Sequence, residues 1–295
     1  MDFRNAKELL KVCQEQGLSI SAVMLQRELT EGEQDPEETD RKMDRVLEIM
    51  KSAASTPIHT PVKSMGGLIG GEAKKISDHK DTGKGLCGDL LERAVIYAMA
   101  TLETNASMGV IVASPTAGSA GIVPGLLLAL QETYDLSDEQ IKQGLYNASA
   151  IGYLAMRNAT VAGAVGGCQA EVGIASAMAA SATVELMGGS PEQSLAAAST
   201  VLMNMLGLVC DPVGGLVEYP CQNRNAAGVA NATIAAEIAL SGVRQLIPFD
   251  EMLEAVYTVG KRLPAELQLS ADAQQHRLHA QPAICVTKLC NVLQI

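Results

Sequence analysis

Three cysteines carry the chemistry that this sequence suggests first. Cys168, Cys210 and Cys221 lie in glycine-, proline- or amide-rich surroundings within a long stretch that has few charged residues. Three thiolates on irregular backbone can bind three irons of a cubic iron–sulfur cluster and leave the fourth iron open as a Lewis acid. Their spacings, however, match neither the C-x-x-C patterns of zinc sites nor the compact ferredoxin motif. Spacing alone therefore favours inert buried thiols, since cysteine is among the residue types most often buried.

The immediate neighbours of these cysteines favour the cluster interpretation. Cys221 follows a proline and precedes four polar residues, and Cys210 precedes an Asp-Pro pair. Such settings place the sulfurs at the ends of secondary-structure elements, where several can converge on one inorganic core. We also expect nearby backbone N–H groups to donate hydrogen bonds to the cluster sulfides, an interaction that tunes such clusters. The glycines that we assign this role are Gly166, Gly167, Gly214 and Gly215.

Two loops rich in glycine and serine are candidate substrate-binding segments. They span residues 63–72 and 114–125, and neither has the G-x-x-x-x-G-K-[ST] spacing of a nucleotide-binding P-loop. Small residues let backbone N–H groups approach a ligand, and hydroxyls with helix N-termini suit a small anion such as a carboxylate. The same residues also fit helix-packing glycines and helix caps, so a purely structural interpretation stays open. The predicted substrate contacts are Lys63, Ser64, Met65, Gly66, Gly67, Ser114, Thr116 and Ser119.

Histidine offers one candidate catalytic base. Of the four histidines, only His59 lies near a candidate site, in a Pro-flanked loop just before residues 63–72. A lone histidine in such a loop is more often a surface residue than a base. The sequence shows no Ser/His/Asp arrangement and no pair of histidines at metal-ligand spacing, so mononuclear zinc hydrolysis is a poor explanation.

Composition limits the classes of function and fold. The net charge is −11 and the pI is near 4.9, which argues against nucleic acid as a partner because phosphate binding needs a positive surface. Hydrophobic residues make up 47% and aromatic residues only 3%, beside 27 glycines, and this suits closely packed helices better than a β-sandwich. Seven cysteines form no dense disulfide framework and the N-terminus lacks an apolar signal segment, so we expect a cytoplasmic protein.

One charge-free window resembles a membrane span at first sight. No charged residue occurs between Glu103 and Glu132. The window contains two prolines and several glycines, which would break a single helix of spanning length. We therefore expect buried core here and no membrane association.

Helical patterns dominate the rest of the chain. Met43, Val46, Leu47 and Met50 form one stripe at helical spacing. Helix starts with capping signatures occur at three further positions: Ser137, Ser190 and Asp250. The alanine-rich run 172–187 reads as a tightly packed buried helix, and alternating strand patterns are scarce.

These patterns predict an all-α fold with a single helical catalytic domain and a short polar N-terminal helical segment. We place the N-terminal segment at residues 1–60 and the catalytic domain at 61–264. The last helix should stop before Pro264, and residues 265–295 form a C-terminal tail.

Five motifs in order resemble those of a known family, over roughly residues 40–262. They are Ser64-Met65-Gly66-Gly67, the segment 114–121, Glu171-Val172-Gly173, the segment 210–215 and Asn223-Arg224-Asn225-Ala226. In this order they are similar to the α chain of bacterial iron–sulfur-dependent L-serine dehydratase, an L-serine ammonia-lyase. The resemblance implies a [4Fe–4S] cluster on Cys168, Cys210 and Cys221 and a helical domain. The implied reaction removes water from L-serine and yields pyruvate and ammonia, with the open iron polarising the substrate hydroxyl.

The same resemblance implies a partner. Two-chain members of that family have a separate β chain with an ACT-like regulatory domain, and a histidine of the β portion is the candidate base. This chain contains neither segment, so we expect it to be inactive, or nearly so, without its partner, and to work as an oligomer. If the chain proves fully active alone, His59 becomes the leading base.

The C-terminal tail departs from the family pattern. It has no glycine after Gly260, and it carries Cys285 and Cys290. Cys290 can imitate a C-terminal cysteine that reaches the cluster in some single-chain relatives, although an ordinary thiol is the simpler interpretation. Two alternatives also stay open: a related cluster-dependent desulfidase acting on L-cysteine, and a non-catalytic helical subunit whose cysteines are structural or bind another metal.

Overall fold

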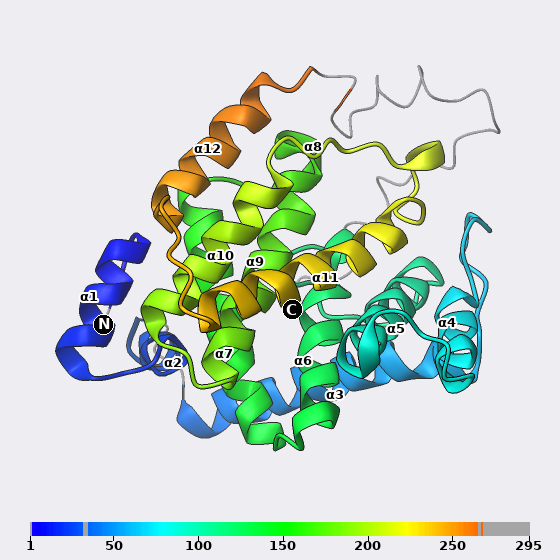
Figure 1. Cartoon of the computed structure of the whole chain (residues 1–295), viewed down its shortest axis with the longest axis horizontal. Coiled ribbons are helices and arrows are strands. Elements are labelled where there is room, and N and C mark those ends of the chain that lie inside the picture. Colours follow the sequence, from blue (N-terminus) through cyan, green and yellow to red (C-terminus); the bar gives the residue numbers. More distant parts are fainter. Residues whose placement is uncertain (1, 32–34, 265–266, 268–295) are drawn as a thin grey trace.

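The computed structural model describes residues 2–31, 35–264 and 267. This part of the chain forms helices and no strand, which confirms the all-α prediction (Figure 1). Twelve α-helices and two short 3₁₀ helices follow one another along it. They are α1 (Ala6–Gln16), α2 (Ile20–Glu31), α3 (Pro36–His59), α4 (Glu72–Asp81), α5 (Gly88–Ala106), η1 (Ala117–Ser119), α6 (Ile122–Tyr134), α7 (Asp138–Asn158), α8 (Gly163–Gly166), α9 (Cys168–Leu186), α10 (Pro191–Met205), η2 (Val213–Gly215), α11 (Cys221–Leu240) and α12 (Phe249–Arg262).

Helix α9 is the centre of the fold. It packs against α6, α7, α10 and α11, and its residues 172–184 are all buried (Figure 1). Most of its side chains are small, so the neighbouring helices approach closely on every side. The prediction of a buried helix at this run is confirmed, and the rigid helix fixes the position of the residues at its N-terminal end.

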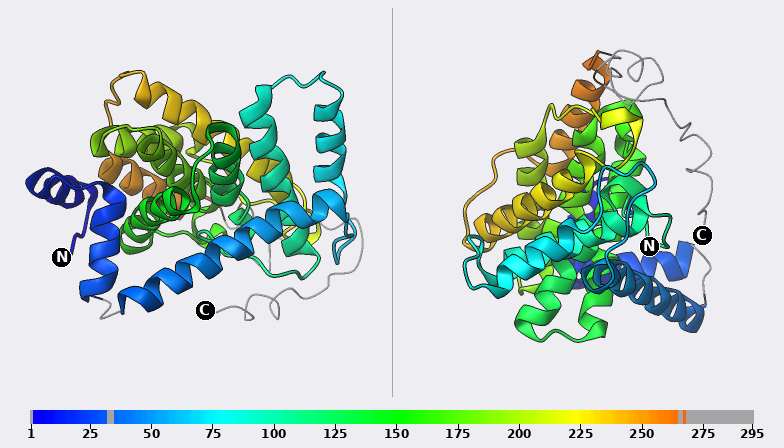
Figure 2. Two further views of the ribbon diagram at one scale, coloured as in Figure 1. Left: turned by 90° about the horizontal axis from the view of Figure 1, so that it is seen from below. Right: turned by 90° about the vertical axis from the view of Figure 1, so that its right-hand side faces the viewer.

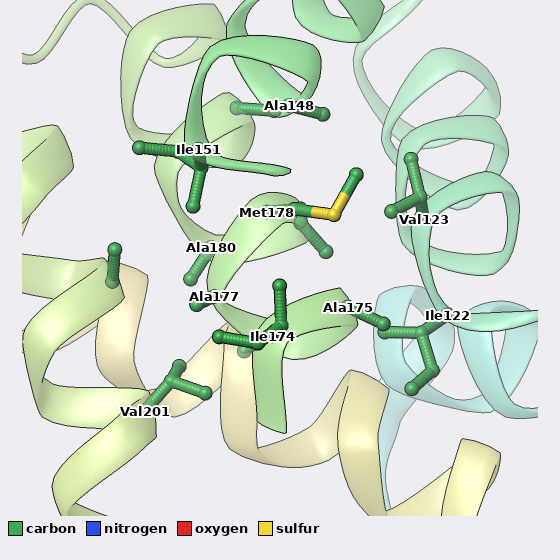
Figure 3. Close-up of a cluster of buried hydrophobic side chains, with 14 of the residues drawn as sticks. Ile122, Val123, Ala148, Ile151, Ile174, Ala175, Ala177, Met178, Ala180 and Val201 are labelled. Carbon is green, nitrogen blue, oxygen red and sulfur yellow. The ribbon is translucent and has the colours of Figure 1, made fainter. Parts of the chain in front are cut away.

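Branched side chains fill the spaces that the alanines leave. Ile151 of α7 and Val201 of α10 lie on the sides of α9 that carry Met178 and Ile174, and Ile122 of α6 lies beside Ala175 (Figure 3). Burying each such side chain contributes about 1.5–3 kcal/mol relative to leaving it in water. This layer holds the four surrounding helices in fixed positions around the site described below.

The outer helices extend the same core. The long helix α3 crosses one face of the molecule, and α4 stands beside α5 at one end (Figure 2). In the stripe predicted for α3, Leu47 and Met50 are buried, and Met43 and Val46 pack partly against the core. The buried side chains of α1 and α2 belong to the same continuous cluster, so the division at residue 60 stays a prediction.

Two of the three predicted helix starts have the expected local form. Ser137 and Ser190 each cap their helix through a capping box, in which the serine and a glutamine three residues later exchange hydrogen bonds. The third was wrong. Asp250 lies inside the first turn of α12, and its carboxylate accepts hydrogen bonds from the N–H groups of Ala6 and Lys7 at 2.8 and 3.1 Å. It therefore stabilises the start of α1, a helix far away in the sequence.

The loop expected around His59 is also wrong, because α3 continues through Pro57 to His59. A proline inside a helix leaves the carbonyl four residues earlier without its usual partner. That carbonyl belongs to Ala53, and it accepts a hydrogen bond of 2.8 Å from the Thr104 hydroxyl of α5. Tertiary contact thus compensates for the local break.

The charge-free window from Glu103 to Glu132 is divided between the end of α5, a loop with η1, and α6. Most of α6 is buried, as expected for core. Within the described residues, no helix combines the length and hydropathy that crossing a bilayer requires.

Candidate metal and substrate site

The three cysteines lie at the ends of helices or just outside them. Cys168 is the first residue of α9, Cys221 is the first residue of α11, and Cys210 lies in the segment that leads to η2. The positive end of the helix dipole lies at a helix N-terminus and favours anionic groups there. The helix dipoles of α9 and α11 therefore favour the thiolate forms of Cys168 and Cys221.

Two of the sulfurs meet a carboxylate. The Sγ atoms of Cys168 and Cys210 and one carboxylate oxygen of Glu171 all lie within 4.8 Å of one another. Cys221 lies outside this tight group, but it is close enough that burial, followed by the charges of Cys168 and Glu171, raises its pKa to about 12. These cysteines are free thiols. The structure thus brings the predicted cysteines into one region, and their assignment as cluster ligands stays a prediction.

Arg224, in the first turn of α11, ties the cysteine-bearing segments together. Its Nη1 lies 3.2 Å from Cys168 Sγ, donates to the Val209 carbonyl at 2.9 Å and pairs with Asp211 at 2.5 Å. A hydrogen bond from Cys210 and the positive charge of Arg224 lower the pKa of Cys168, although burial opposes them. The same hydrogen bond, together with burial, raises the pKa of Cys210. Cys168 is therefore the thiolate that the surroundings favour most.

The expected N–H donors to cluster sulfides are largely engaged elsewhere, so this expectation was wrong for three of the four glycines. The N–H groups of Gly166 and Gly167 donate to the carbonyls of Ala162 and Gly163 at 2.9 Å. The N–H group of Gly215 donates to the Pro212 carbonyl at 3.2 Å. These N–H groups are therefore already hydrogen-bonded to backbone carbonyls three or four residues earlier in the chain.

The loop at 114–121 faces the carboxylate of Glu171. The Thr116 hydroxyl donates to Glu171 and lies 2.9 Å from the Ser119 hydroxyl. Asn225 of α11 holds the loop by accepting from the Gly121 N–H at 3.1 Å and donating to the Gly118 carbonyl at 2.8 Å. The loop is thereby fixed against the site by α11.

One hydroxyl of this loop lacks a partner. The Ser114 Oγ is buried and forms no hydrogen bond within the described part of the chain. A buried hydroxyl without a partner is costly, and such groups often mark a place where a ligand or water binds. Ser114 was predicted as a substrate contact, and its free hydroxyl is compatible with that prediction.

Glu171 is the acidic group of the site. Burial raises the pKa of Glu171, while the hydrogen bond from Thr116 and the charge of Arg224 lower it. A Cβ added at Gly118 would lie 2.6 Å from Oε1, and one added at Gly163 would lie 2.6 Å from Oε2 and 3.5 Å from Cys210 Sγ. Two glycines therefore keep the space around this carboxylate and the sulfur open.

The loop at 63–72 is arranged differently, because it surrounds the carboxylate of Glu218, which lies just before α11. Glu218 accepts from the Ser64 hydroxyl at 2.6 Å, the Gly66 N–H at 2.7 Å and the Leu68 N–H at 3.0 Å. The Gly67 N–H donates to the Ser64 oxygens. The loop thus has the anion-binding geometry that the sequence suggested, and the bound anion in this structure is Glu218.

A second buried carboxylate holds the end of the same loop. Glu103 accepts from the Gly71 and Ala73 N–H groups at 3.0 and 2.9 Å. It also accepts from the side-chain amide of Gln222 at 3.0 Å. Burial raises the pKa of Glu103, and these backbone donors oppose the shift.

The remaining predicted contacts lie at the surface. Lys63 is exposed, with its Cε 3.5 Å from the place where a Cβ on Gly67 would lie. Met65 has an exposed side chain, and its N–H donates to the Ala106 carbonyl at 2.9 Å. His59 is the exposed last residue of α3. The roles of these residues in substrate binding or catalysis stay predictions.

Sequence reasoning assigned no site role to five polar residues that organise this region. Four of them are almost completely buried, and burial of a polar side chain demands a hydrogen-bond partner. The sequence gives the polar residue types but indicates neither their burial nor their partners. The residues are Glu103, Glu171, Glu218, Gln222 and Asn225.

Cys285, Cys290 and nearly all of the tail at 265–295 lie outside the described residues. The exception is Leu267, whose carbonyl accepts a hydrogen bond of 3.0 Å from the Cys210 N–H. The chain just after α12 thus passes beside one of the three cysteines.

Comparison with known proteins gives matches over most of the chain. Residues 15–273 match the family model described as "Serine dehydratase alpha chain". The chain is 48% identical over 266 residues to the probable L-serine dehydratase, alpha chain, of Bacillus subtilis (strain 168), covering 90% of this chain and 88% of that protein. It is 45% identical over 261 residues to the L-serine dehydratase, alpha chain, of Peptoniphilus asaccharolyticus, covering 88% and 89%. It is also 34% identical over 266 residues to the L-serine dehydratase TdcG of Escherichia coli (strain K12), covering 88% of this chain but only 58% of that longer protein.

Proposed function

The chain belongs to the serine dehydratase alpha chain family, and from that membership we propose that it is the catalytic subunit of an L-serine ammonia-lyase. The reaction removes water from L-serine and gives pyruvate and ammonia. The observation that supports the proposal most directly is the meeting of Cys168, Cys210 and Glu171 within 4.8 Å, beside Cys221 and the loop at 114–121.

The donor set fits an iron–sulfur cluster. Three free thiols from three separate segments converge, and the surroundings favour the thiolate of Cys168. The glycines at 118 and 163 leave room beside them that larger residues would fill. Cys168, Cys210 and Cys221 would hold a [4Fe–4S] cluster. When bound, this group would supply one iron without a protein ligand, a Lewis acid for the hydroxyl of serine.

The protein groups around this position match the other parts of the substrate. Glu171 forms no ion pair within the described residues, so its carboxylate is available for the ammonium group of serine. Ser114 and Ser119 offer hydroxyls on the same loop, with Thr116 holding Glu171 in place. Lys63 offers a positive charge for the substrate carboxylate at the edge of the first loop.

We propose that the base comes from a partner chain. Relatives named "alpha chain" imply a beta chain, and this chain matches only 58% of the longer relative from Escherichia coli. Met65, Leu68 and Met108 expose large apolar side chains on adjoining segments near the first loop, as protein-binding surfaces often do. The β partner would carry an ACT-like regulatory domain, and the complex would be a cytoplasmic oligomer.

The proposal is tested by anaerobic reconstitution of the purified chain with iron and sulfide, with and without a β-type partner. We expect a brown protein with stoichiometric iron and sulfide that releases pyruvate from L-serine only with the partner. Full activity without the partner would refute the partner base and direct attention to His59.

Cys210→Ala is the matched variant for the ligand assignment. It should lose most of the iron while keeping its helical circular dichroism, because Cys210 lies outside the helices. A variant that retains full iron would overturn the assignment. Sulfide released from L-cysteine in preference to pyruvate from L-serine would instead identify a desulfidase.

A further inference from the structure

The segment that carries Cys221 also holds the first candidate loop. Glu218 lies three residues before Cys221 and takes three donors from residues 64–68. It is 3% exposed, and no ion pair of Glu218 occurs in the part of the chain that the structure describes. A buried carboxylate without a counter-ion depends on hydrogen bonds to offset the loss of water. The loop must therefore stay wrapped around Glu218 for the segment to remain buried.

The residue on the other side of Cys221 has a similar connection. The side-chain amide of Gln222 donates to Glu103 at 3.0 Å, and Glu103 holds the Gly71 and Ala73 N–H groups. The Gln222 N–H donates to the Glu218 carbonyl at 2.9 Å, which closes the first turn of α11. One end of residues 64–73 is thus bound directly to Glu218, and the other end is connected through Glu103 to Gln222, on the two sides of Cys221 in the sequence.

We propose that Glu218 and Gln222 are positioning residues that couple the loop at 64–73 to Cys221, so that loading the metal site orders the loop. The inference rests on the proposed function, because it takes Cys221 as a cluster ligand. Only a few residues separate Cys221 from Glu218, and each residue spans at most about 3.6 Å. Fixing the sulfur on an iron therefore limits how far Glu218, and the loop wrapped around it, can move.

The arrangement gives the loop a role other than direct recognition by its N–H groups. The N–H groups of Gly66 and Leu68 are occupied by Glu218 and that of Gly71 by Glu103, so they are not free to bind a substrate. An enzyme without its metal would then have a loosened loop and weak affinity for serine. Binding of the metal and binding of the substrate become linked through one short segment.

Hydrogen exchange followed by mass spectrometry tests the coupling at the loop itself. In wild-type protein, removing the cluster should speed exchange in peptides covering 64–69 and leave peptides from the interior of α9 unchanged. Glu218→Gln should speed exchange in 64–69 by about 10- to 100-fold, because the amide side chain replaces an acceptor with a donor. It should raise KM for serine more than it lowers kcat, with iron content retained.

Glu103→Gln is the matched control. It should speed exchange in peptides covering 70–74 and leave 64–69 within a few-fold of wild type. Ser64→Ala, which removes one donor to Glu218, provides a milder second variant in case Glu218→Gln fails to fold, and it should affect 64–69 in the same direction. Unchanged exchange in 64–69 upon cluster removal, or in both Glu218→Gln and Ser64→Ala, would overturn the inference.

The two proposals fail in different ways. A loaded protein that does not convert serine but still protects residues 64–69 would refute the proposed function and support the coupling. A protein that converts serine while exchange in 64–69 is indifferent to loading would refute the coupling alone.

Discussion

The two glycine- and serine-rich loops look alike in sequence but differ in what satisfies their polar groups. In the loop at 63–72, Glu218 accepts from the Ser64 hydroxyl and the N–H groups of Gly66 and Leu68, and Glu103 accepts from the Gly71 N–H. In the loop at 114–125, the Ser114 hydroxyl has no partner within the described residues, and Thr116 binds a carboxylate at the cysteines. The first loop has its hydrogen-bond donors satisfied by buried carboxylates of the protein. The second loop contacts the carboxylate beside the cysteines and keeps one hydroxyl without a partner in the described residues.

This difference separates positioning from binding. A loop whose donors are already bound inside the protein contributes order, and its loss should appear first in stability. A loop with an unpaired buried hydroxyl and a contact to an unpaired acid contributes recognition, and its loss should appear first in kinetics. Variants of corresponding residues in the two loops should therefore differ in whether stability or kinetics changes more.

The largest effect is expected for Glu171→Gln, which changes the carboxylate that the loop at 114–125 contacts. Losing one partner of a buried charge pair costs about 2–5 kcal/mol, so without the proposed contact to the substrate ammonium kcat/KM for serine should fall by roughly 30- to 4,000-fold. Iron content should stay at the wild-type level, because the three cysteines are unchanged. Steady-state kinetics on anaerobically reconstituted complex, with iron analysis of the same sample, provide the measurement. A loss of iron would show that Glu171 binds the metal instead of the substrate.

The next effect compares one glycine from each loop. A Cβ on Gly66 would lie 2.2 Å from Leu216 Cδ1 and 2.7 Å from Glu218 Oε1, so Gly66→Ala should lower the free energy of unfolding by about 1–3 kcal/mol. A Cβ on Gly118 would press on Glu171 at 2.6 Å, so Gly118→Ala should reduce activity more than stability. Thermal unfolding and steady-state kinetics of both variants provide the measurements. Equal losses of stability in the two variants would contradict the proposed difference between the loops.

Two serines give a smaller but cleaner contrast. Ser64→Ala removes a donor from a buried carboxylate and should cost about 1–2 kcal/mol of stability. Ser114→Ala removes a hydroxyl that has no partner, so stability should change by less than about 0.5 kcal/mol while KM rises. Chemical denaturation measures the first and substrate titration the second. A destabilised Ser114→Ala would indicate a structural partner for that hydroxyl.

The smallest effect is expected for a variant outside both loops. Asp250→Ala removes the acceptor for the first N–H groups of α1 and should cost about 1 kcal/mol, the usual value of a helix cap. Activity and loop exchange should not change, since α1 packs mainly on α2, α10 and α12 rather than on the helices that begin at Cys168 and Cys221. Reduced activity at unchanged stability would show that the start of α1 is coupled to the site over a long distance.

Local chemistry determined much of what the sequence could predict. The capping boxes at Ser137 and Ser190 form because serine and glutamine three residues apart satisfy the same helix end, so no tertiary information is needed. The buried character of α9 follows from its composition. The order of the motifs is enough by itself to indicate the family, whereas the assignment of the three cysteines to a metal site stays a prediction.

The tertiary structure decided which distant group each buried polar residue meets. Asp250 is a residue type that often caps its own helix, yet its carboxylate accepts from the first N–H groups of α1. The Ala53 carbonyl that Pro57 leaves without a partner accepts from Thr104 of α5. The Ser64–Leu68 loop binds an anion, as its sequence suggested, yet that anion is Glu218, more than a hundred residues later. A residue type and its neighbours fix what kind of partner it needs. Only packing of the whole chain fixes which partner comes within hydrogen-bonding distance.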